Sequence, residues 1–170
     1  TRAVSKIALG LQDKLYLGNL NAKRDWGHAK DYVEAMYLIL QQPEPDDYVI
    51  ATGKTTEVRE FVRMSFKEVG IEVEFKGTGV EEKGYIKSCS NPAYQVEVGR
   101  EVVAIDPRYF RPTEVDLLIG DPTKSNTKLG WYPKHDLASL VKDMMEHDIK
   151  LFERDKYLLE GGHKIFNYHE

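Results

Sequence analysis

The sequence has a single cysteine, Cys89, so it can form neither an internal disulfide framework nor a cysteine-built zinc site. It has no apolar run near the ~20 residues of a membrane span and no apolar signal-peptide segment at its N-terminus. Its 24 Lys and Arg against 28 Asp and Glu give a net charge of −4, which argues against an extended nucleic-acid interface. We therefore expect a cytoplasmic protein with no nucleic-acid or membrane partner.

Several catalytic patterns are also missing. The five histidines are scattered, and no pair has His-Glu-x-x-His spacing, so we expect no metal site. None of the ten tyrosines begins a Tyr-x-x-x-Lys pair, and there is no Gly-x-Ser-x-Gly nucleophile motif. The chain carries no recognisable catalytic constellation of its own.

What is present predicts an α/β fold. The length of 170 residues suits one domain, and 41% hydrophobic with 31% charged residues is ordinary for a globular chain. Helical and strand periodicities alternate along the chain. The expected helices are 1–11, 31–41, 56–69, 121–129 and one beginning at 136; the expected strands are 14–19, 48–52, 71–75 and 101–105; residues 77–101 are expected to form a long surface loop.

The stretch "GNLNAKRDWGHAKDYVEAM" (18–36) places a basic pair, Lys23 and Arg24, before a helix. Asp31 and Glu34 fit an Asp-x-x-Glu capping box for that helix. Cations near a helix N-terminus oppose the macrodipole, so the pair favours a negatively charged ligand nearby. The alternative is a solvated surface pair.

Two glycine-containing stretches look like nucleotide loops but lack required positions. "ATGKTT" (51–56) has Tyr48 where a P-loop needs its first glycine. "GTGVEEKG" (77–84) has Glu82 at the third glycine position of a dinucleotide fingerprint, and no helical pattern follows. We exclude a P-loop NTPase and expect no nicotinamide-cofactor loop within the chain.

Three arginines lie near helix starts or tight turns: Arg24, Arg59 and Arg111. Guanidinium forks combined with helix N-termini suit a diphosphate. Glu114 lies three residues after Arg111, and its carboxylate can accept hydrogen bonds from two adjacent hydroxyls such as those of a ribose. The alternative is that each arginine forms a surface salt bridge of little consequence.

The stretches "GNLNAKRDWGHAKDYVEAMYLILQ", "YVIATGKTTEVREFV" and "YFRPTEVDLLIGDPTKSNTKLGWYP" resemble the C-terminal half of the GDP-mannose 4,6-dehydratase family. That family belongs to the extended short-chain dehydrogenases, with related epimerases and dehydratases of sugar nucleotides. The resemblance implies late strands of an incomplete Rossmann sheet plus a small α/β substrate-binding domain over 1–152. Residues 153–170 would be a polar C-terminal tail.

The resemblance also implies roles for individual residues. Arg24 and Arg111 would hold the diphosphate of GDP-mannose, and Glu114 would contact the ribose. Asn19, with the backbone of neighbouring residues, would line the nucleoside pocket. The full set of substrate-binding residues implied is Leu17, Gly18, Asn19, Lys23, Arg24, Arg59, Arg111 and Glu114.

The other half of the family's fold carries what this chain lacks: the NADP loop, a catalytic Thr and Glu, and the Tyr-x-x-x-Lys pair. There, NADP oxidises the hexose at C4, water leaves from C6 and the hydride returns to C6, giving GDP-4-dehydro-6-deoxymannose on the route to GDP-fucose. Because the chain begins without a cap or a start methionine, we expect it to be part of a longer protein. The resemblance implies a homo-oligomeric full-length enzyme, and the missing cofactor loop and catalytic residues imply that the chain alone is inactive. The alternatives are another sugar-nucleotide epimerase or dehydratase, and a noncatalytic nucleotide-binding module.

Overall fold

The computed structural model describes residues 1–113, 115 and 117–165. Four strands form a mixed sheet in the order β1-β6-β5-β4: β1 (Leu15–Leu17), β4 (Ile71–Lys76), β5 (Lys83–Cys89) and β6 (Glu101–Ile105). β1 and β6 run parallel, whereas the β6–β5 and β5–β4 pairs are antiparallel. β2 (Lys23–Asp25) and β3 (Thr55–Glu57) form a separate antiparallel pair.

Three helices pack with the four-stranded sheet: α1 (Arg2–Ala8), α3 (Val58–Glu68) and α5 (Leu137–Glu160). Their apolar stripes and the inward faces of the strands form one core, as burial of apolar surface requires. Its buried members are Val4, Ile7, Ala8, Val62, Phe66, Val69, Ile71, Val73, Ile86, Val102, Val103, Val141 and Met145. We call this part of the molecule the sheet unit.

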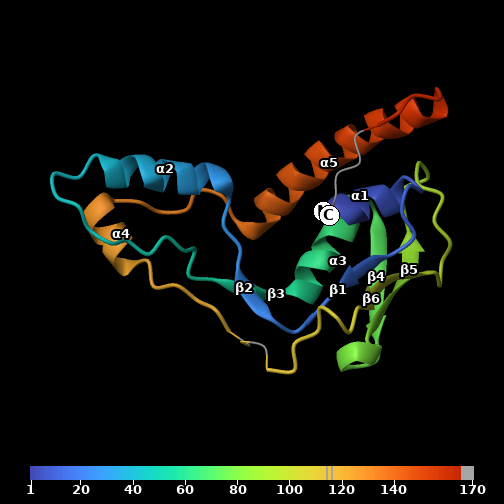
Figure 1. The fold of residues 1–170 in the computed structure, drawn as a ribbon, viewed down its shortest axis with the longest axis horizontal. Coiled ribbons are helices and arrows are strands. Elements are labelled where there is room, and N and C mark those ends of the chain that lie inside the picture. The colour runs from blue at the N-terminus through green and yellow to red at the C-terminus, as the bar shows by residue number, and fades with distance from the viewer. Residues whose placement is uncertain (114, 116, 166–170) are drawn as a thin grey trace.

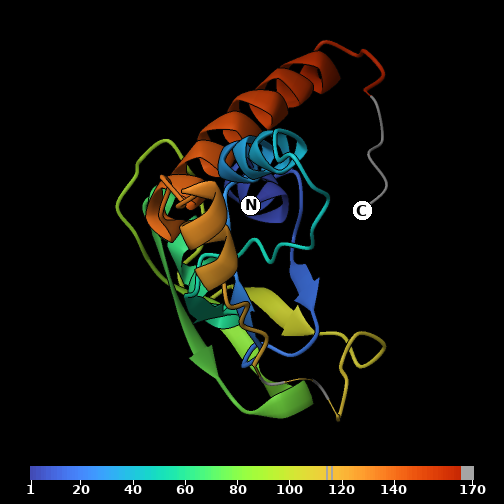
Figure 2. The same ribbon diagram turned by 90° about the vertical axis from the view of Figure 1, so that its left-hand side faces the viewer.

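The remaining elements form an arm at the opposite end of the molecule (Figure 1). The arm comprises residues 26–54 and 118–136, with α2 (Ala29–Leu40) and α4 (Thr123–Leu129). Figure 2 views the molecule from the end that α2 and α4 form. The chain crosses between the sheet unit and the arm several times, and β2 and β3 lie at the junction.

Several sequence predictions are confirmed. Strands 71–75 and 101–105 are β4 and β6, and the Asp136 carboxylate caps α5 by accepting from the Ser139 amide at 2.8 Å. Gly70 follows the end of α3 with φ +76°, a conformation that glycine adopts without steric cost. The expected boundary after residue 152 falls inside α5, which continues to Glu160.

Other predictions of local structure are wrong. Residues 77–101 are not one loop, because they contain β5, a central strand of the sheet. Gly84 obscured the strand pattern of β5 in the sequence. The neighbouring strand β6 lies so close that a Cβ at this position would be 2.9 Å from the Val103 Cβ, so glycine stands where a strand would normally carry a side chain. The helix expected from residue 56 begins only at Val58, because Thr56 lies in β3 and Glu57 occupies the N-cap position.

The predicted strand at 48–52 is also absent from the assigned strands, and Val49 is 52% exposed. This segment is held by side contacts: the Ser125 hydroxyl donates to the Val49 carbonyl at 2.9 Å. A strand needs a ladder partner for its backbone groups, and the described residues offer this segment none. The apolar side chains of this segment are therefore only partly buried within this chain.

Among the described residues, no helix combines the length and apolar character needed to span a membrane. In the same part of the chain, no three His, Cys, Asp or Glu side chains gather as a possible metal site.

Candidate functional site

The candidate site begins where β1 and β6 end at one edge of the sheet. Leu17 pairs with Ile105, and the Asp106 amide donates to the Leu17 carbonyl at 2.9 Å. Because parallel strands deliver their following loops to the same edge, residues 18–25 run near residues 106–113, 115 and 117. We call residues 17–25 and the described residues of 106–117 the site segments.

Gly18 allows the two segments to approach closely. A Cβ on Gly18 would lie 2.4 Å from the Tyr109 carbonyl oxygen, far inside van der Waals contact with a backbone atom. The opposite turn is built by Asp106, whose backbone carbonyl accepts from the amides of Tyr109 and Phe110 at 2.9 and 3.1 Å. Side-chain and backbone hydrogen bonds from Arg108 lower the pKa of the Asp106 carboxyl below its ordinary value.

Asn19 joins the segments through its side chain. Its Nδ2 donates to the Arg111 carbonyl and its Oδ1 accepts from the Arg111 amide, both at 2.8 Å. The pair of bonds copies the exchange that two residues make in a β-ladder. These two bonds therefore fix the Arg111 backbone beside the segment that follows β1.

The basic pair lies further along the same contact. The Arg24 guanidinium donates through one nitrogen to the carbonyls of Lys23 and Val115, at 2.9 and 3.2 Å. Lys23 forms a parallel β-bridge with Leu117. Lys23 and Arg111 are exposed, and neither makes a side-chain ion pair within the part of the chain that the structure describes. The structure thus places Leu17, Gly18 and Asn19 beside residues 105–111, and it places Arg24 and Lys23 against Val115 and Leu117 further along the same two segments. Glu114 lies outside the described residues.

Arg59 is held differently from the other predicted arginines. Its guanidinium donates to both Glu82 oxygens at 2.7 and 2.9 Å, to Glu57 at 2.8 Å, and to Asn21. The Glu82 hydrogen bonds raise the pKa of Arg59 above its ordinary value. This network connects α3 to the loop before β5, and a ligand contact by Arg59, which stays a prediction, would compete with buried Glu82.

The "ATGKTT" turn is occupied by a carboxylate of the chain itself. Asp25 accepts from the Thr52 amide at 3.0 and 3.1 Å, from the Thr52 hydroxyl at 2.6 Å and from the Gly53 amide at 2.9 Å. Two consecutive amides directed at an anion are how a glycine turn binds phosphate. The turn therefore positions β2, and the amides that a phosphate would use are already engaged.

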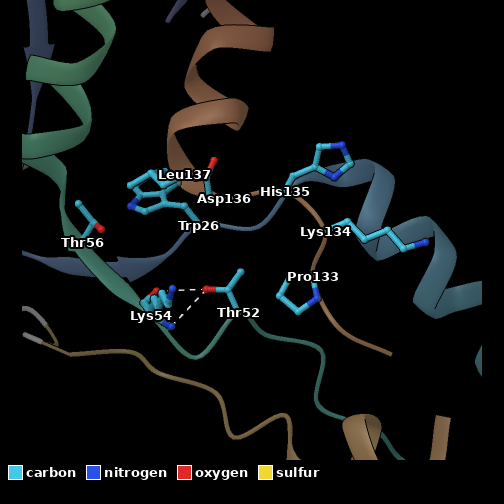
Figure 3. A pocket seen from close by; sticks show the side chains of 9 residues that line it. All are labelled: Trp26, Thr52, Lys54, Thr56, Pro133, Lys134, His135, Asp136 and Leu137. Carbon is cyan, nitrogen blue, oxygen red and sulfur yellow. Dashed lines mark hydrogen bonds between the residues drawn. The ribbon is translucent and has the colours of Figure 1, made fainter. Parts of the chain in front are cut away.

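A pocket of about 250 Å³ lies beside this turn, between residues 52–56 and the segment that leads into α5 (Figure 3). Three of its polar side chains have structural partners: Asp136 caps α5, Thr52 binds Asp25, and His135 contacts Asp31. None of the predicted substrate-binding residues lines it. The lining residues are Trp26, Thr52, Lys54, Thr56, Pro133, Lys134, His135, Asp136 and Leu137.

Neither of the two glycine turns named in the sequence has the geometry of a dinucleotide-binding loop. Gly77 and Gly79 lie in the connection between the antiparallel strands β4 and β5, followed by a single short 3₁₀ turn, Gly79–Glu81. A dinucleotide loop needs a helix N-terminus after the glycines. The other glycine turn, at Gly53, is bound by Asp25.

Sequence reasoning missed the two carboxylates that shape the site, Asp25 and Asp106. Each of these residues has a local signal in the sequence. Asp25 and Arg24 are successive residues of a strand and so point to opposite faces, and Asp106 precedes a proline at the end of a strand. Neither signal names the distant partner.

Residues 1–144 match the family described as GDP-mannose 4,6 dehydratase. The GDP-mannose 4,6-dehydratase of Yersinia enterocolitica is 49% identical over 166 residues, which cover 97% of this chain and 45% of that protein. The human GDP-mannose 4,6 dehydratase is 48% identical over 151 residues, covering 89% of this chain and 38% of its own length. This chain thus spans less than half the length of these relatives.

Solved structures share the fold at lower identity. RMD from Pseudomonas aeruginosa, solved with NADPH, superposes with a TM-score of 0.64 at 18% identity, over 88% of this chain and 41% of that one. The UDP-glucose 4-epimerase of Thermotoga maritima, solved with UDP-glucose, gives 0.58 at 21% identity, over 88% and 38%. These likenesses place the chain among extended short-chain dehydrogenase folds. With most of its length matched and about half its residues identical to named members, the chain belongs to the GDP-mannose 4,6-dehydratase family.

Proposed function

We propose that this chain is the part of a GDP-mannose 4,6-dehydratase that binds the GDP moiety of GDP-mannose. The observation that carries the proposal is the grouping of Lys23, Arg24 and Arg111 on adjoining site segments. Arg111 and Lys23 are exposed there, and the Asp25 and Asp106 carboxylates of the same segments accept hydrogen bonds from Gly53 and Arg108. A diphosphate suits such a set of cations, and Glu114 keeps its predicted role at the ribose.

The proposed enzyme is a lyase that uses NADP in the GDP-fucose pathway. In it, the remaining length of the relatives supplies the cofactor loop and the catalytic residues. The residues described here bind and orient the nucleotide end of the substrate. Binding energy from that remote end positions the sugar for reaction.

The arm supports the proposal that the chain is an incomplete Rossmann unit. Val33, Met36, Tyr37 and Leu40 recur at helical spacing on α2, yet all four are at least 60% exposed. Val49, in the segment without a ladder partner, is exposed as well. We propose that α2 and residues 48–52 pack, in the full-length enzyme, against the part that this chain does not span. Residues 48–52 would join the sheet of that part.

Replacing Arg111 tests the GDP site. Arg111→Ala should weaken binding of GDP to the 170-residue chain by roughly 1.5–3 kcal/mol, the range for hydrogen bonds to a charged group. This corresponds to about a 10- to 150-fold higher Kd, measured by calorimetric or NMR titration.

Arg63→Ala is the matched control, because it removes the same charge from the outer side of α3, where Arg63 faces Glu60 and Phe75. It should leave GDP affinity within about twofold, as expected for a remote screened charge. GDP binding that is equal in wild type and Arg111→Ala, or absent from wild type, would refute the proposed site.

A second expectation concerns the isolated chain. It should convert no GDP-mannose to GDP-4-dehydro-6-deoxymannose and should bind NADP no better than a mutated control such as Gly53→Ala, because its glycine turns do not fit the cofactor. Product analysis by mass spectrometry and NADP titration measure this. Turnover by the purified chain would contradict it.

A further inference from the structure

The strand ladder between β1 and β6 stops at Asp106, five residues before Arg111. Beyond that point, Asn19 joins the site segments with a pair of hydrogen bonds, donating to the Arg111 carbonyl and accepting from its amide at 2.8 Å each. We propose that Asn19 is a positioning residue, which acts on the ligand by fixing the Arg111 backbone. This inference rests on the proposed function.

Both polar atoms of the Asn19 amide form a hydrogen bond with the Arg111 backbone. Its oxygen faces an N–H and its nitrogen faces a carbonyl, so the opposite amide orientation would lose both bonds. The sequence prediction placed Asn19 in the wall of the nucleoside pocket. The geometry points to a contact with Arg111 instead.

Two neighbouring residues make the contact effective. Gly18 lets the segments approach, since any side chain there would meet the Tyr109 carbonyl. Pro112 restricts the backbone immediately after Arg111. Arg111 is thus held at its own amide and carbonyl and limited on its C-terminal side, while its side chain stays exposed.

Without Asn19, a ligand would have to order the Arg111 backbone as it binds. Ordering the backbone of one residue has an entropic cost that corresponds to roughly a 5- to 30-fold change in an equilibrium constant. The loss should depend entirely on Arg111, because Asn19 makes no ligand contact of its own.

A double-mutant cycle tests this dependence. GDP is titrated into the 170-residue chain as wild type, Asn19→Ala, Arg111→Ala and the double variant. Asn19→Ala should raise the Kd about 5- to 30-fold in the wild-type background and less than about twofold when Arg111 is already alanine. An equal factor in both backgrounds would overturn the positioning role and indicate direct contact.

Amide hydrogen exchange provides a readout that a general loss of stability would not imitate. In Asn19→Ala, the Arg111 amide should exchange faster while the amides of β5 keep their rates. Unchanged protection of the Arg111 amide would also overturn the proposal. If Asn19→Ala does not fold, Asn19→Ser, which is too short to span both groups, takes its place.

The two proposals fail differently. If Arg111→Ala binds GDP as wild type does, the GDP site itself is refuted. If Arg111→Ala weakens binding but the Asn19 effect is the same in both backgrounds, only the positioning role is refuted.

Discussion

Trp131→Ala should destabilise the arm by about 3–5 kcal/mol, the usual loss for truncating a large buried aromatic side chain. Trp131 is 1% exposed, and its indole Nε1 donates to the Asp31 carbonyl on α2 at 2.9 Å. It follows α4 directly after Gly130, so it is the side chain that connects both helices of the arm. The core of the sheet unit does not include it.

Because the arm has few other buried apolar side chains, the loss of stability caused by Trp131→Ala should be confined to the arm. Hydrogen exchange of Trp131→Ala should show faster exchange across α2 and α4 and little change in β4, β5 and β6. Trp131→Phe is the matched control: it keeps most of the apolar volume, loses the bond to Asp31 and should cost only about 1 kcal/mol. Equal acceleration in the sheet strands would show that arm and sheet unit unfold together.

Elements with local sequence signals were predictable. The Asp136 cap of α5, the glycine after α3 and the alternating strand β4 depend on residues within a few positions of one another. The α/β class follows from the alternation of those elements. Local rules therefore gave most of the sheet unit.

The elements that failed depend on distant residues. The capping box predicted for α2 is wrong: the helix begins at Ala29, and the His28 Nδ1 accepts from the Lys30 amide at 3.1 Å. Asp31 instead faces residues 134 and 135, a hundred positions away. The apolar stripe of α2 has the predicted period but no described partner, so periodicity gave the helix without its environment.

The candidate site was only partly readable. The resemblance supplied Arg24 and Arg111, but no pattern shows that Asn19 contacts the Arg111 backbone 92 positions later. Likewise, the carboxylates that engage Arg59 include Glu82, which the sequence analysis considered only as a missing glycine. Charge type is visible in a sequence, whereas its neutralising partner is a property of the fold.

The contact that displaced the predicted cap should be among the strongest in the arm. Asp31 is 1% exposed; it accepts from the Lys134 and His135 amides at 3.0 Å each and contacts the His135 Nδ1 at 2.7 Å. Asp31→Ala leaves those donors without their acceptor and should lower the free energy of unfolding by about 3 kcal/mol, measured by urea denaturation at pH 7. Glu34→Gln, which breaks the exposed pair with Lys134, should change it by no more than about 0.5 kcal/mol.

The effect should also depend on pH in a defined direction. Burial by itself would raise the pKa of Asp31, but hydrogen bonds from the His135 side chain and from the His135 and Lys134 amides hold it below its ordinary value. A carboxyl with a lowered folded-state pKa stabilises the fold fully above its unfolded pKa of about 3.9, and this contribution is lost as pH falls through the folded pKa. The difference between wild type and Asp31→Asn should therefore shrink as the pH falls below about 4. A difference that instead grows as the pH falls below about 4 would mean that Asp31 is protonated in the folded chain, and its hydrogen bonds to residues 134 and 135 would then need another explanation.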